Sequence, residues 1–301
     1  MNSVAIVGAG ALGILFGWQL QRCCGAERVF FPMDAERYER HSRETYSVNG
    51  EPAALHLVRA EDCPKVDLVL VATKDAGLRG AMEVMAPAVG EHTLILSVLN
   101  GILSEELLAE RFGPERVAGC VALGMDAMRQ GTALTWSRPG RLQLGALLPE
   151  QTDAVAGAAA FLRGAGIAVE EVDDIRRALW SKFMLNVGIN QTCMVYNVPY
   201  GPALHTQPCR ADLEAVMREA IAVARAEGVG LTETDMDKAI ALIDTLDPAA
   251  SPSMRQDLLA RRPSEVALFA GTVLRYAAKH GIPVPVNRRY ADRIRGIEAG
   301  Y

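Results

Sequence analysis

A glycine-rich loop near the N-terminus constrains the fold of this chain more than any other feature. The loop, Gly8–Gly13 (GAGALG), follows an apolar stretch typical of a buried strand, Val4–Val7, and opens a segment with helical periodicity, Ala11–Cys23. In this context the first glycine permits a tight turn, the second lets a pyrophosphate approach the backbone, and the third lets the helix pack closely on the strand. Free amides at the helix start favour a bound phosphate. The loop therefore predicts a dinucleotide site, and a glycine turn without a ligand is the alternative.

An acidic residue follows the next expected strand, Arg28–Phe31. Asp34 lies 21 residues beyond Gly13, where an acid usually accepts hydrogen bonds from the adenosine ribose and favours NAD. Three arginines follow closely, and they are suited to a 2′-phosphate instead: Arg37, Arg40 and Arg43. A solvated helix face is the other explanation of these charges. The preference between the two cofactors stays open at this point.

The rest of the first half alternates apolar strands with helical segments. Expected strands are Val66–Ala72, Thr93–Val98, Val117–Leu123 and Ile167–Val172, and expected helices are Leu78–Met85, Ser104–Arg111 and Gln151–Leu162. The stretches Ala133–Ser137 and Arg141–Leu144 flank Arg138-Pro139-Gly140, which predicts an antiparallel pair. Alternating strands and helices are typical of βαβ units, so we predict an α/β Rossmann-type doubly wound sheet over residues 1–172.

The second half contains helical patterns and no expected strand. Five segments carry helical periodicity with caps: Asp174–Val195, Ala211–Glu227, Thr232–Leu246, Met254–Ala260 and Ser264–His280. We therefore predict an all-α domain over residues 173–301.

Two polar residues stand where expected strands end, which is where ligands bind in open α/β sheets. Lys74 follows Val66–Ala72 and places a cation near the ligand crevice. Asn100 follows Thr93–Val98, but Asn-Gly is also an ordinary turn dipeptide. Both residues are candidates for the functional site.

A mostly apolar helical segment carries three polar residues at intervals of four. Lys182, Asn186 and Asn190 therefore form one stripe along the helix, and the apolar remainder predicts that the stripe faces a wet cleft. Lysine is rarely buried without partners, and a partly desolvated lysine gives up its proton more readily, which suits proton transfer near neutral pH. A polar contact between helices, with Lys182 reaching solvent, is the structural alternative.

Helix capping explains several polar residues further on. Ser251 before Pro252 is a typical N-cap arrangement, and Ser253 with Gln256 predicts a capping box. Glu265 is expected in the first turn of the next helix, where an acid complements the helix dipole. From the residues alone, structure and function explain these positions about equally well.

Composition excludes several classes of protein. The 301 residues are 50% hydrophobic and 22% charged, with a net charge of −5, which argues against disorder and against a nucleic-acid partner. No apolar run approaches the ~20 residues of a membrane span, and a secretory signal is not expected. The 6 cysteines and 5 histidines lack metal-ligand spacing, so we expect no metal site and a cytoplasmic location with reduced thiols.

Taken together, the ordered motifs resemble the ketopantoate reductase (2-dehydropantoate 2-reductase) family over essentially the whole chain. The motifs are GAGALG at Gly8–Gly13, TK at Thr73-Lys74, NG at Asn100-Gly101, LWSKFMLNVGIN at Leu179–Asn190, SPSMRQD at Ser251–Asp257, and PSEVALFAGTVLRYAAKHGIPVPVN at Pro263–Asn287. The resemblance implies a Rossmann domain, a helical domain like that of 6-phosphogluconate dehydrogenase, and an active site between them. It also implies NADPH-dependent reduction of 2-dehydropantoate to D-pantoate, a step towards pantothenate and coenzyme A.

The resemblance implies roles for individual residues. Lys182 matches the general acid, and Glu265 matches a carboxylate that contacts the reacting hydroxyl. Substrate-binding positions match Asn100, Asn186, Asn190 and Ser253, and cofactor-binding positions match Gly8, Ala9, Gly10, Ala11, Leu12, Gly13, Lys74 and Asn100. Asp34 departs from the basic residue common in NADPH-dependent members, so NAD(H) remains an option beside NADP(H).

A second departure concerns the substrate pocket. Ala267 and Ala270 stand where the family often has an acidic residue and an asparagine, which predicts a more apolar pocket. The alternatives are a reductase of another branched 2-oxo acid on the same fold and a dinucleotide-binding sensor without catalysis. The presence of both Lys182 and Glu265 argues against the sensor. Apolar helices after Ala211 predict a homodimer.

Overall fold

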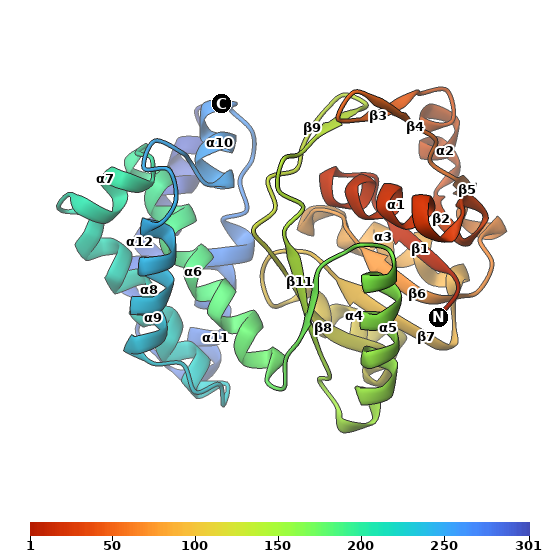
Figure 1. The fold of residues 1–301 in the computed structure, drawn as a ribbon. Helices are drawn as coiled ribbons and strands as arrows, with labels where there is room; N and C mark the ends of the chain where they lie inside the picture. The colour runs from red at the N-terminus through yellow and green to blue at the C-terminus, as the bar shows by residue number, and fades with distance from the viewer. The chain divides into compact units, whose positions relative to one another are not determined.

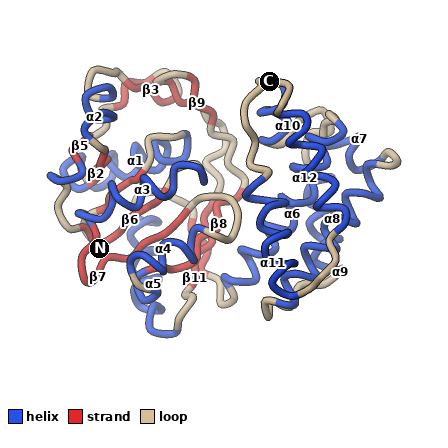
Figure 2. The backbone as a smooth tube through the Cα atoms, turned by 180° about the vertical axis from the view of Figure 1, so that it is seen from behind, coloured by secondary structure: helices blue, strands red, loops and turns tan.

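The computed structural model describes residues 1–301, which divide into two compact units. The first unit comprises Met1–Asn100 and Ser104–Ile175, and the second comprises Gly101–Leu103 and Arg176–Tyr301. Every strand belongs to the first unit, and the chain from Arg176 onward forms helices and loops (Figure 2). The fold class predicted from the sequence, a Rossmann-type sheet followed by an all-helical part, is confirmed.

One eight-stranded sheet forms the centre of the first unit (Figure 1). Its strands are β1 (Val4–Val7), β2 (Val29–Met33), β5 (Leu57–Arg59), β6 (Val66–Val71), β7 (Val89–Ser97), β8 (Val117–Leu123), β11 (Arg141–Gly145) and β12 (Val169–Glu171). Their order is β12-β11-β8-β7-β6-β1-β2-β5, and the six strands from β8 to β5 run parallel. The sheet reverses its direction of growth at β1 and β6, and open α/β sheets bind ligands at such a point.

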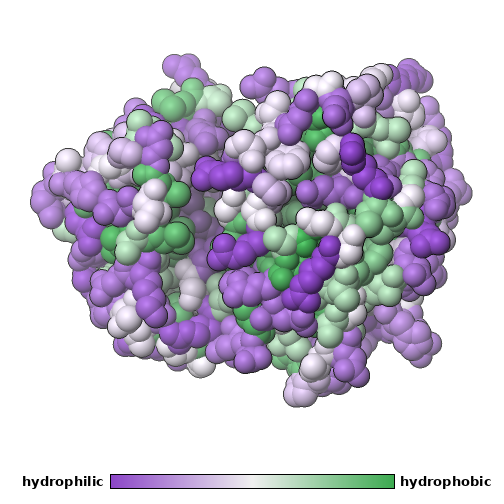
Figure 3. All heavy atoms as spheres, in the orientation of Figure 1, coloured by the Kyte–Doolittle hydropathy of each residue, from purple (hydrophilic) through white to green (hydrophobic).

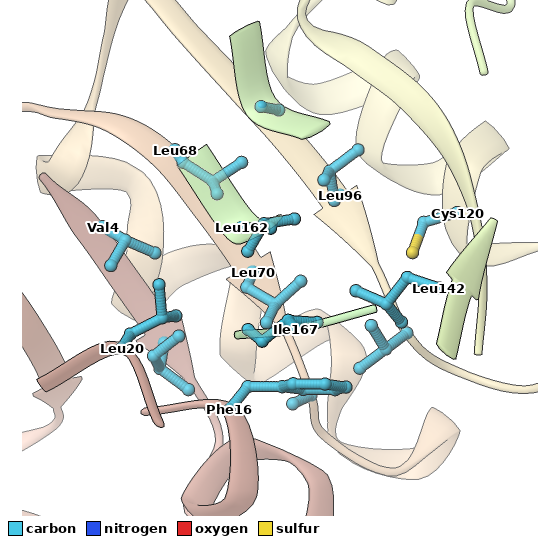
Figure 4. Packing of buried hydrophobic residues seen from close by; sticks show 14 of the residues in the cluster. Val4, Phe16, Leu20, Leu68, Leu70, Leu96, Cys120, Leu142, Leu162 and Ile167 are labelled. Carbon is cyan, nitrogen blue, oxygen red and sulfur yellow. The ribbon is translucent and has the colours of Figure 1, made fainter. Parts of the chain in front are cut away.

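Side chains alternate between two cores, one on each face of this sheet. The helices of the first unit are α1 (Ala11–Cys24), α2 (Ala35–His41), α3 (Leu78–Met85), α4 (Ser104–Phe112) and α5 (Thr152–Gly164). On one face, Val4 and Leu70 pack with Phe16 of α1 and Leu162 of α5 (Figure 4). On the other face, neighbouring strand residues pack with α3 and α4. Burial of both faces explains why these strands read as continuous apolar runs.

A second, four-stranded sheet was not predicted. It consists of β4 (Glu51–Ala53), β3 (Tyr46–Val48), β10 (Ala133–Thr135) and β9 (Met128–Gln130), in that order. Its buried residues pack on the outer side of α1, where Tyr46, Val48 and Leu134 meet Ile14 and Leu15. We call it the accessory sheet. Its strands are three residues long, too short to show a hydrophobic period.

The antiparallel pairing predicted across Arg138-Pro139-Gly140 is wrong. β10 pairs with β9 and β3 in the accessory sheet, whereas β11 pairs with β8 in the main sheet. The carboxylate of Asp126 binds the segment between these strands, because its Oδ1 accepts hydrogen bonds from the backbone N–H of Ser137 at 2.9 Å and of Arg138 at 2.7 Å. The Arg-Pro-Gly segment is therefore a crossing between two sheets, and Gly140 adopts a φ of +68° there.

The second unit is built from helices around an aromatic core. The helices are α6 (Ile175–Tyr196), α7 (Tyr200–His205), α8 (Cys209–Ala226), α9 (Glu233–Asp244), α10 (Ser253–Leu259), α11 (Thr272–His280) and α12 (Pro285–Glu298), with a π-helical segment at Ala267–Gly271. Trp180 of α6 packs edge-on against Phe183, and Phe183 packs against Phe269. The sequence predicted α6, α8, α9, α10 and α11, and it missed the short α7 and the 14-residue α12.

Hydrophilic side chains cover much of the visible face, with apolar patches between them (Figure 3). The large hydrophobic residues that are exposed are few and scattered: Met128, Leu242, Leu259 and Tyr301. The structure contains no helix with both the length and the apolar character needed to cross a bilayer.

Candidate functional site

Two glycines of the loop between β1 and α1 are required by the packing of the protein itself. Gly8 has a φ of +113°, and a Cβ there would lie 2.8 Å from the carbonyl oxygen of Ala72. A Cβ on Gly13 would lie 1.9 Å from the carbonyl oxygen of Gly8. The backbone of the loop therefore touches both β6 and α1 so closely that a side chain does not fit at either position.

Gly10 is different, because the protein's own packing would tolerate a side chain there. Its φ is −79°, and a Cβ would meet only the Ala72 carbonyl oxygen, at an ordinary 3.4 Å. Gly10 is the N-cap of α1, whose first turn has no acidic residue and no side-chain cap. The missing Cβ thus leaves space beside helix amides that no side chain satisfies, and this arrangement is suited to a phosphate.

A cavity of about 190 Å³ opens at the loop, entirely within the first unit. It is lined by Val7, Gly8, Ala9, Gly10, Pro32, Met33, Arg37, His41, Thr73, Ala81, Val84 and Arg129. Complete ligand pockets usually measure roughly 300–1,000 Å³, so this cavity has room for part of a dinucleotide. The buried hydroxyl oxygen of Thr73 has no hydrogen-bond partner, as expected of a group that binds a ligand. Loop amides, this hydroxyl and two arginines fit the phosphate part of a dinucleotide.

Asp34 is engaged by its own helix. Its Oδ1 accepts a hydrogen bond from the backbone N–H of Arg37 at 2.8 Å, which caps α2, and its Oδ2 lies 3.5 Å from Arg37 Nε. Of the three arginines considered from the sequence, Arg37 lines the cavity. Arg40 contacts the ring of His41, and Arg43 lies 3.8 Å from Glu39.

The two candidates at strand ends occupy different surroundings. Lys74 is exposed and is not among the residues that line the cavity, whereas its neighbour Thr73 is. Asn100 is half-buried and is the last residue of the first unit before Gly101–Leu103. Gly101 adopts a φ of +92°, and a Cβ there would lie 2.6 Å from Leu268 Cδ1. The glycine of the Asn-Gly pair is therefore explained by backbone conformation and packing, and a ligand role of Asn100 stays a prediction.

Lys182, Asn186 and Asn190 all lie on α6, as their spacing predicts. Asn190 joins α6 to α10, which is the contact between helices expected in the structural alternative, and a wet cleft along the stripe stays a prediction. Asn186 and Asn190 are 7% and 6% exposed, and Asn190 Nδ2 donates to Asn186 Oδ1 at 3.2 Å. Asn190 Oδ1 accepts from Ser253 Oγ at 3.1 Å and from the backbone N–H of Met254 at 3.3 Å. Lys182 is half-buried one turn before Asn186. The structure thus brings three of the four predicted substrate residues together within the second unit.

These contacts correct the capping prediction for Ser253. Pro252 is the N-cap of α10, and Ser253 is the first residue of the helix. Its hydroxyl points to Asn190 rather than to its own backbone, and Gln256 Nε2 donates to the carbonyl oxygen of Ser251. Side-chain polarity at the start of α10 therefore serves the contact between two helices instead of a capping box.

Glu265 lies two residues before the π-helical segment Ala267–Gly271 rather than inside an α-helical first turn. The backbone N–H of Gly271 donates to the carbonyl oxygen of Val266, five residues earlier, at 3.0 Å. Such segments are frequent at functional sites, and no local pattern in the sequence predicted this one. Ala267 is exposed, whereas Ala270 is fully buried.

Sequence reasoning missed several residues that line the cavity, and Thr73 and Arg129 are the two that matter most for a ligand. Thr73 was noted only as the neighbour of Lys74. Arg129 lies 120 residues from Ala9, whose carbonyl oxygen accepts a hydrogen bond from its guanidinium. No local pattern could have indicated a contact between residues so far apart in the chain.

A Rossmann unit with this loop and cavity, followed by a helical unit with a polar stripe, defines an NAD(P)-dependent oxidoreductase, and comparison with known proteins agrees. Two family models match, "Ketopantoate reductase PanE/ApbA" over residues 4–149 and its C-terminal counterpart over residues 174–298. The chain belongs to the ketopantoate reductase family.

Individual relatives cover nearly all or most of the chain. A solved 2-dehydropantoate 2-reductase from Geobacter metallireducens GS-15 is 31% identical, with 98% of this chain and 99% of that chain covered and a TM-score of 0.85. A curated 2-dehydropantoate 2-reductase from Halobacterium salinarum is 29% identical over 76% of this chain and 75% of the relative. D-mandelate dehydrogenase, solved with NADH and anilino(oxo)acetate, is 22% identical, covers 99% of each chain and has a TM-score of 0.87. This last likeness concerns the fold alone.

Proposed function

We propose that this protein reduces the C2 ketone of 2-dehydropantoate to D-pantoate with NADPH. The observation that carries the proposal is the linked polar set on α6 and α10, in which Asn186, Asn190 and Ser253 are joined by hydrogen bonds one turn from Lys182. A small oxo acid needs several converging polar groups, and this set supplies them next to a cation. The family and its relatives named 2-dehydropantoate 2-reductase support this substrate.

Lys182 acts as the general acid in this proposal. A nicotinamide cofactor held at the glycine loop would supply a hydride to the ketone carbon, and the electron pair of the C=O bond would then move to oxygen. Negative charge builds on that oxygen, so a cation beside it stabilises the transition state. Lys182 donates the proton that completes the hydroxyl group. Glu265 orients this hydroxyl, and Asn100, Asn186, Asn190 and Ser253 bind the rest of the substrate.

NADPH is the cofactor we propose, although Asp34 at first favours NADH. Asp34 already accepts the capping hydrogen bond of α2 and is neutralised by Arg37, which lowers its availability for a ribose. Beside Asp34, the cavity lining includes Arg37 and His41 and no acidic residue, which favours an added phosphate. In the same proposal Gly8, Ala9, Gly10, Ala11, Leu12, Gly13 and Lys74 bind the cofactor.

In this proposal the two parts of the chain have the separate roles that the sequence predicts. Residues 1–172 bind the dinucleotide, and residues 173–301 bind the substrate and form a homodimer. The reaction belongs to pantothenate and coenzyme A biosynthesis and takes place in the cytoplasm, a location that the six free cysteines favour.

A reductase of a different 2-oxo acid is the second candidate. Ala267 and Ala270 remove polar side chains that family members often carry, and a related fold was solved as D-mandelate dehydrogenase with anilino(oxo)acetate. Proton donation by Lys182 serves either substrate, so the side chains that line the substrate pocket would determine which 2-oxo acid is preferred.

The test is oxidation of NADPH and NADH, followed by loss of absorbance, with 2-dehydropantoate and with a panel of branched and aromatic 2-oxo acids. We expect the highest kcat/KM for 2-dehydropantoate with NADPH. Asp34→Ala should leave the NADPH/NADH efficiency ratio nearly unchanged if Arg37 already neutralises this carboxylate. Preference for an aromatic 2-oxo acid would establish the second candidate, and a large rise of the ratio in Asp34→Ala would show that Asp34 reads the ribose.

A further inference from the structure

The accessory sheet delivers one charged side chain to the glycine loop. The sheet lies on the outer side of α1, held by an apolar cluster that includes Tyr46, Val48 and Leu134. From β9, Arg129 extends to the loop, and its Nη1 donates a hydrogen bond to the carbonyl oxygen of Ala9. The same side chain lines the cavity beside Gly8, Ala9 and Gly10.

The guanidinium of Arg129 is held in a fixed position. Its Nε donates to the carbonyl oxygen of Gly131 at 2.7 Å, within the turn that joins β9 to β10. The ring of Tyr46 lies below it, 5.8 Å from the centroid to the guanidinium carbon. Tyr46 is held in turn by Glu44, because its hydroxyl donates to Glu44 Oε2 at 2.7 Å. A cation fixed in this way loses little side-chain entropy when it binds an anion.

Donors for a phosphate remain on Arg129. A guanidinium carries five N–H groups, and the two backbone contacts engage only Nε and Nη1. Two further donors converge on the cavity, the buried hydroxyl of Thr73 without a partner and the uncapped start of α1. No acidic side chain is among the residues that line it. The combination is complementary to a doubly charged diphosphate.

We propose that Arg129 binds the pyrophosphate of the dinucleotide and, through Ala9, fixes the loop peptide that receives it. The inference rests on dinucleotide binding in the glycine loop, which is part of the proposed function. The pyrophosphate is favoured over the 2′-phosphate because the bond to Ala9 places the guanidinium at the loop rather than at Asp34. The accessory sheet is then a binding element of the enzyme, and its four strands hold this one arginine in place.

The experiment compares Arg129→Met with Arg129→Lys and with the control Arg22→Met in the full-length protein. Arg22 joins α1 to the accessory sheet through Glu51 at 3.3 Å and does not line the cavity. Calorimetry measures the Kd of ADP, NADH and NADPH, with adenosine as a ligand without phosphate and thermal melting as a check on folding. A charge-assisted hydrogen bond predicts that Arg129→Met raises the Kd of ADP, NADH and NADPH about tenfold or more.

Adenosine binding should stay unchanged in Arg129→Met, and Arg129→Lys should recover part of the affinity for ADP. Arg22→Met should bind all ligands like the wild type. Equal Kd values for ADP in the wild type and Arg129→Met, or a loss confined to NADPH, would overturn the inference. An equal loss for adenosine and ADP would also overturn it, because it indicates collapse of the pocket. Failure of the wild type itself to bind any dinucleotide would refute the proposed function instead.

Discussion

At the scale of single residues, the three glycines of the loop have separate reasons to be glycine. Gly8 and Gly13 lack side chains because backbone atoms of Ala72 and Gly8 occupy that space. Gly10 lacks one although the protein leaves room for it. The physical difference between them is therefore what an added side chain would meet. At Gly8 and Gly13 it would collide with backbone atoms, and at Gly10 it would make only an ordinary contact with the Ala72 carbonyl oxygen.

Alanine substitutions separate these reasons. Gly8→Ala should lower the free energy of unfolding by about 2 kcal/mol or more, because alanine is strained at a φ of +113° and contacts the Ala72 carbonyl. Gly10→Ala should change stability by less than about 1 kcal/mol and raise the Kd of NADPH at least tenfold. Denaturant unfolding and calorimetry measure the two effects. If Gly10→Ala binds NADPH like the wild type, no ligand approaches the loop at this position.

The sequence predicted the arrangement of site residues where the residues that lie side by side are also close in the chain. The intervals of four between Lys182, Asn186 and Asn190 place them on one helix face whatever else the chain does, so the stripe could be read from the sequence. The hydrogen bond from Ser253 to Asn190 could not be predicted, because the sequence around Ser253 is equally typical of a helix cap. The contact of Arg129 with Ala9 depends on the accessory sheet, which left no trace in the local pattern.

At the scale of elements, the buried strands of the main sheet were predictable and the pairing of the accessory sheet was not. β6 and β8 are apolar on both faces and read as continuous runs, so their bounds follow the sequence closely. The strands of the accessory sheet have only three residues each, and β3 pairs with β10, which is far away in the chain, so local sequence does not indicate this pairing. The segment between β8 and β11 shows the consequence, because its turn signal indicated a hairpin where the chain changes sheets.

Asp126, which binds the segment between β10 and β11, gives a prediction about stability at low pH. Burial alone would raise the pKa of Asp126, but hydrogen bonds from the Ser137 hydroxyl and from the backbone of Ser137 and Arg138 outweigh it and hold the pKa at about 2, below the ordinary 3.8. A carboxyl with a lowered folded-state pKa stabilises the protein above its ordinary pKa, and this contribution is lost as the pH falls towards 2.

We therefore expect Asp126→Asn to lower the Tm by a few degrees at pH 7, since the amide keeps fewer of these hydrogen bonds. The difference from the wild type should shrink between pH 4 and pH 2, where the wild-type carboxyl takes up its proton. Calorimetric melting across this range makes the comparison, with Asp237→Asn as a control, because Asp237 is exposed and lies beyond the first turn of α9. A difference that is independent of pH would show that the charge of Asp126 does not matter.

At the scale of the whole molecule, the residues proposed to hold the dinucleotide pyrophosphate and the residues proposed to transfer the proton belong to different units. The first unit contains the glycine loop, the cavity and Arg129, and the second contains Lys182 with its linked asparagines and Ser253. A substitution in the second unit should then affect turnover without affecting dinucleotide binding. The two-part fold was predictable because the sequence changes from strand–helix alternation to helices near residue 173.

Substitution of Lys182 is the most direct test, because it tests two claims together. One is that Lys182 donates the proton, and the other is that dinucleotide binding belongs to the first unit alone. The measurement is kcat for 2-dehydropantoate, with the Kd of NADPH, in the wild type, Lys182→Ala, Lys182→Arg and the exposed-lysine control Lys238→Ala. Both Lys182 variants should lose about 10²–10⁴-fold in kcat, the usual scale for a general acid, and keep the Kd of NADPH. Arginine keeps the charge but does not release a proton. Wild-type turnover in Lys182→Arg, or loss of NADPH binding in Lys182→Ala, would contradict the account.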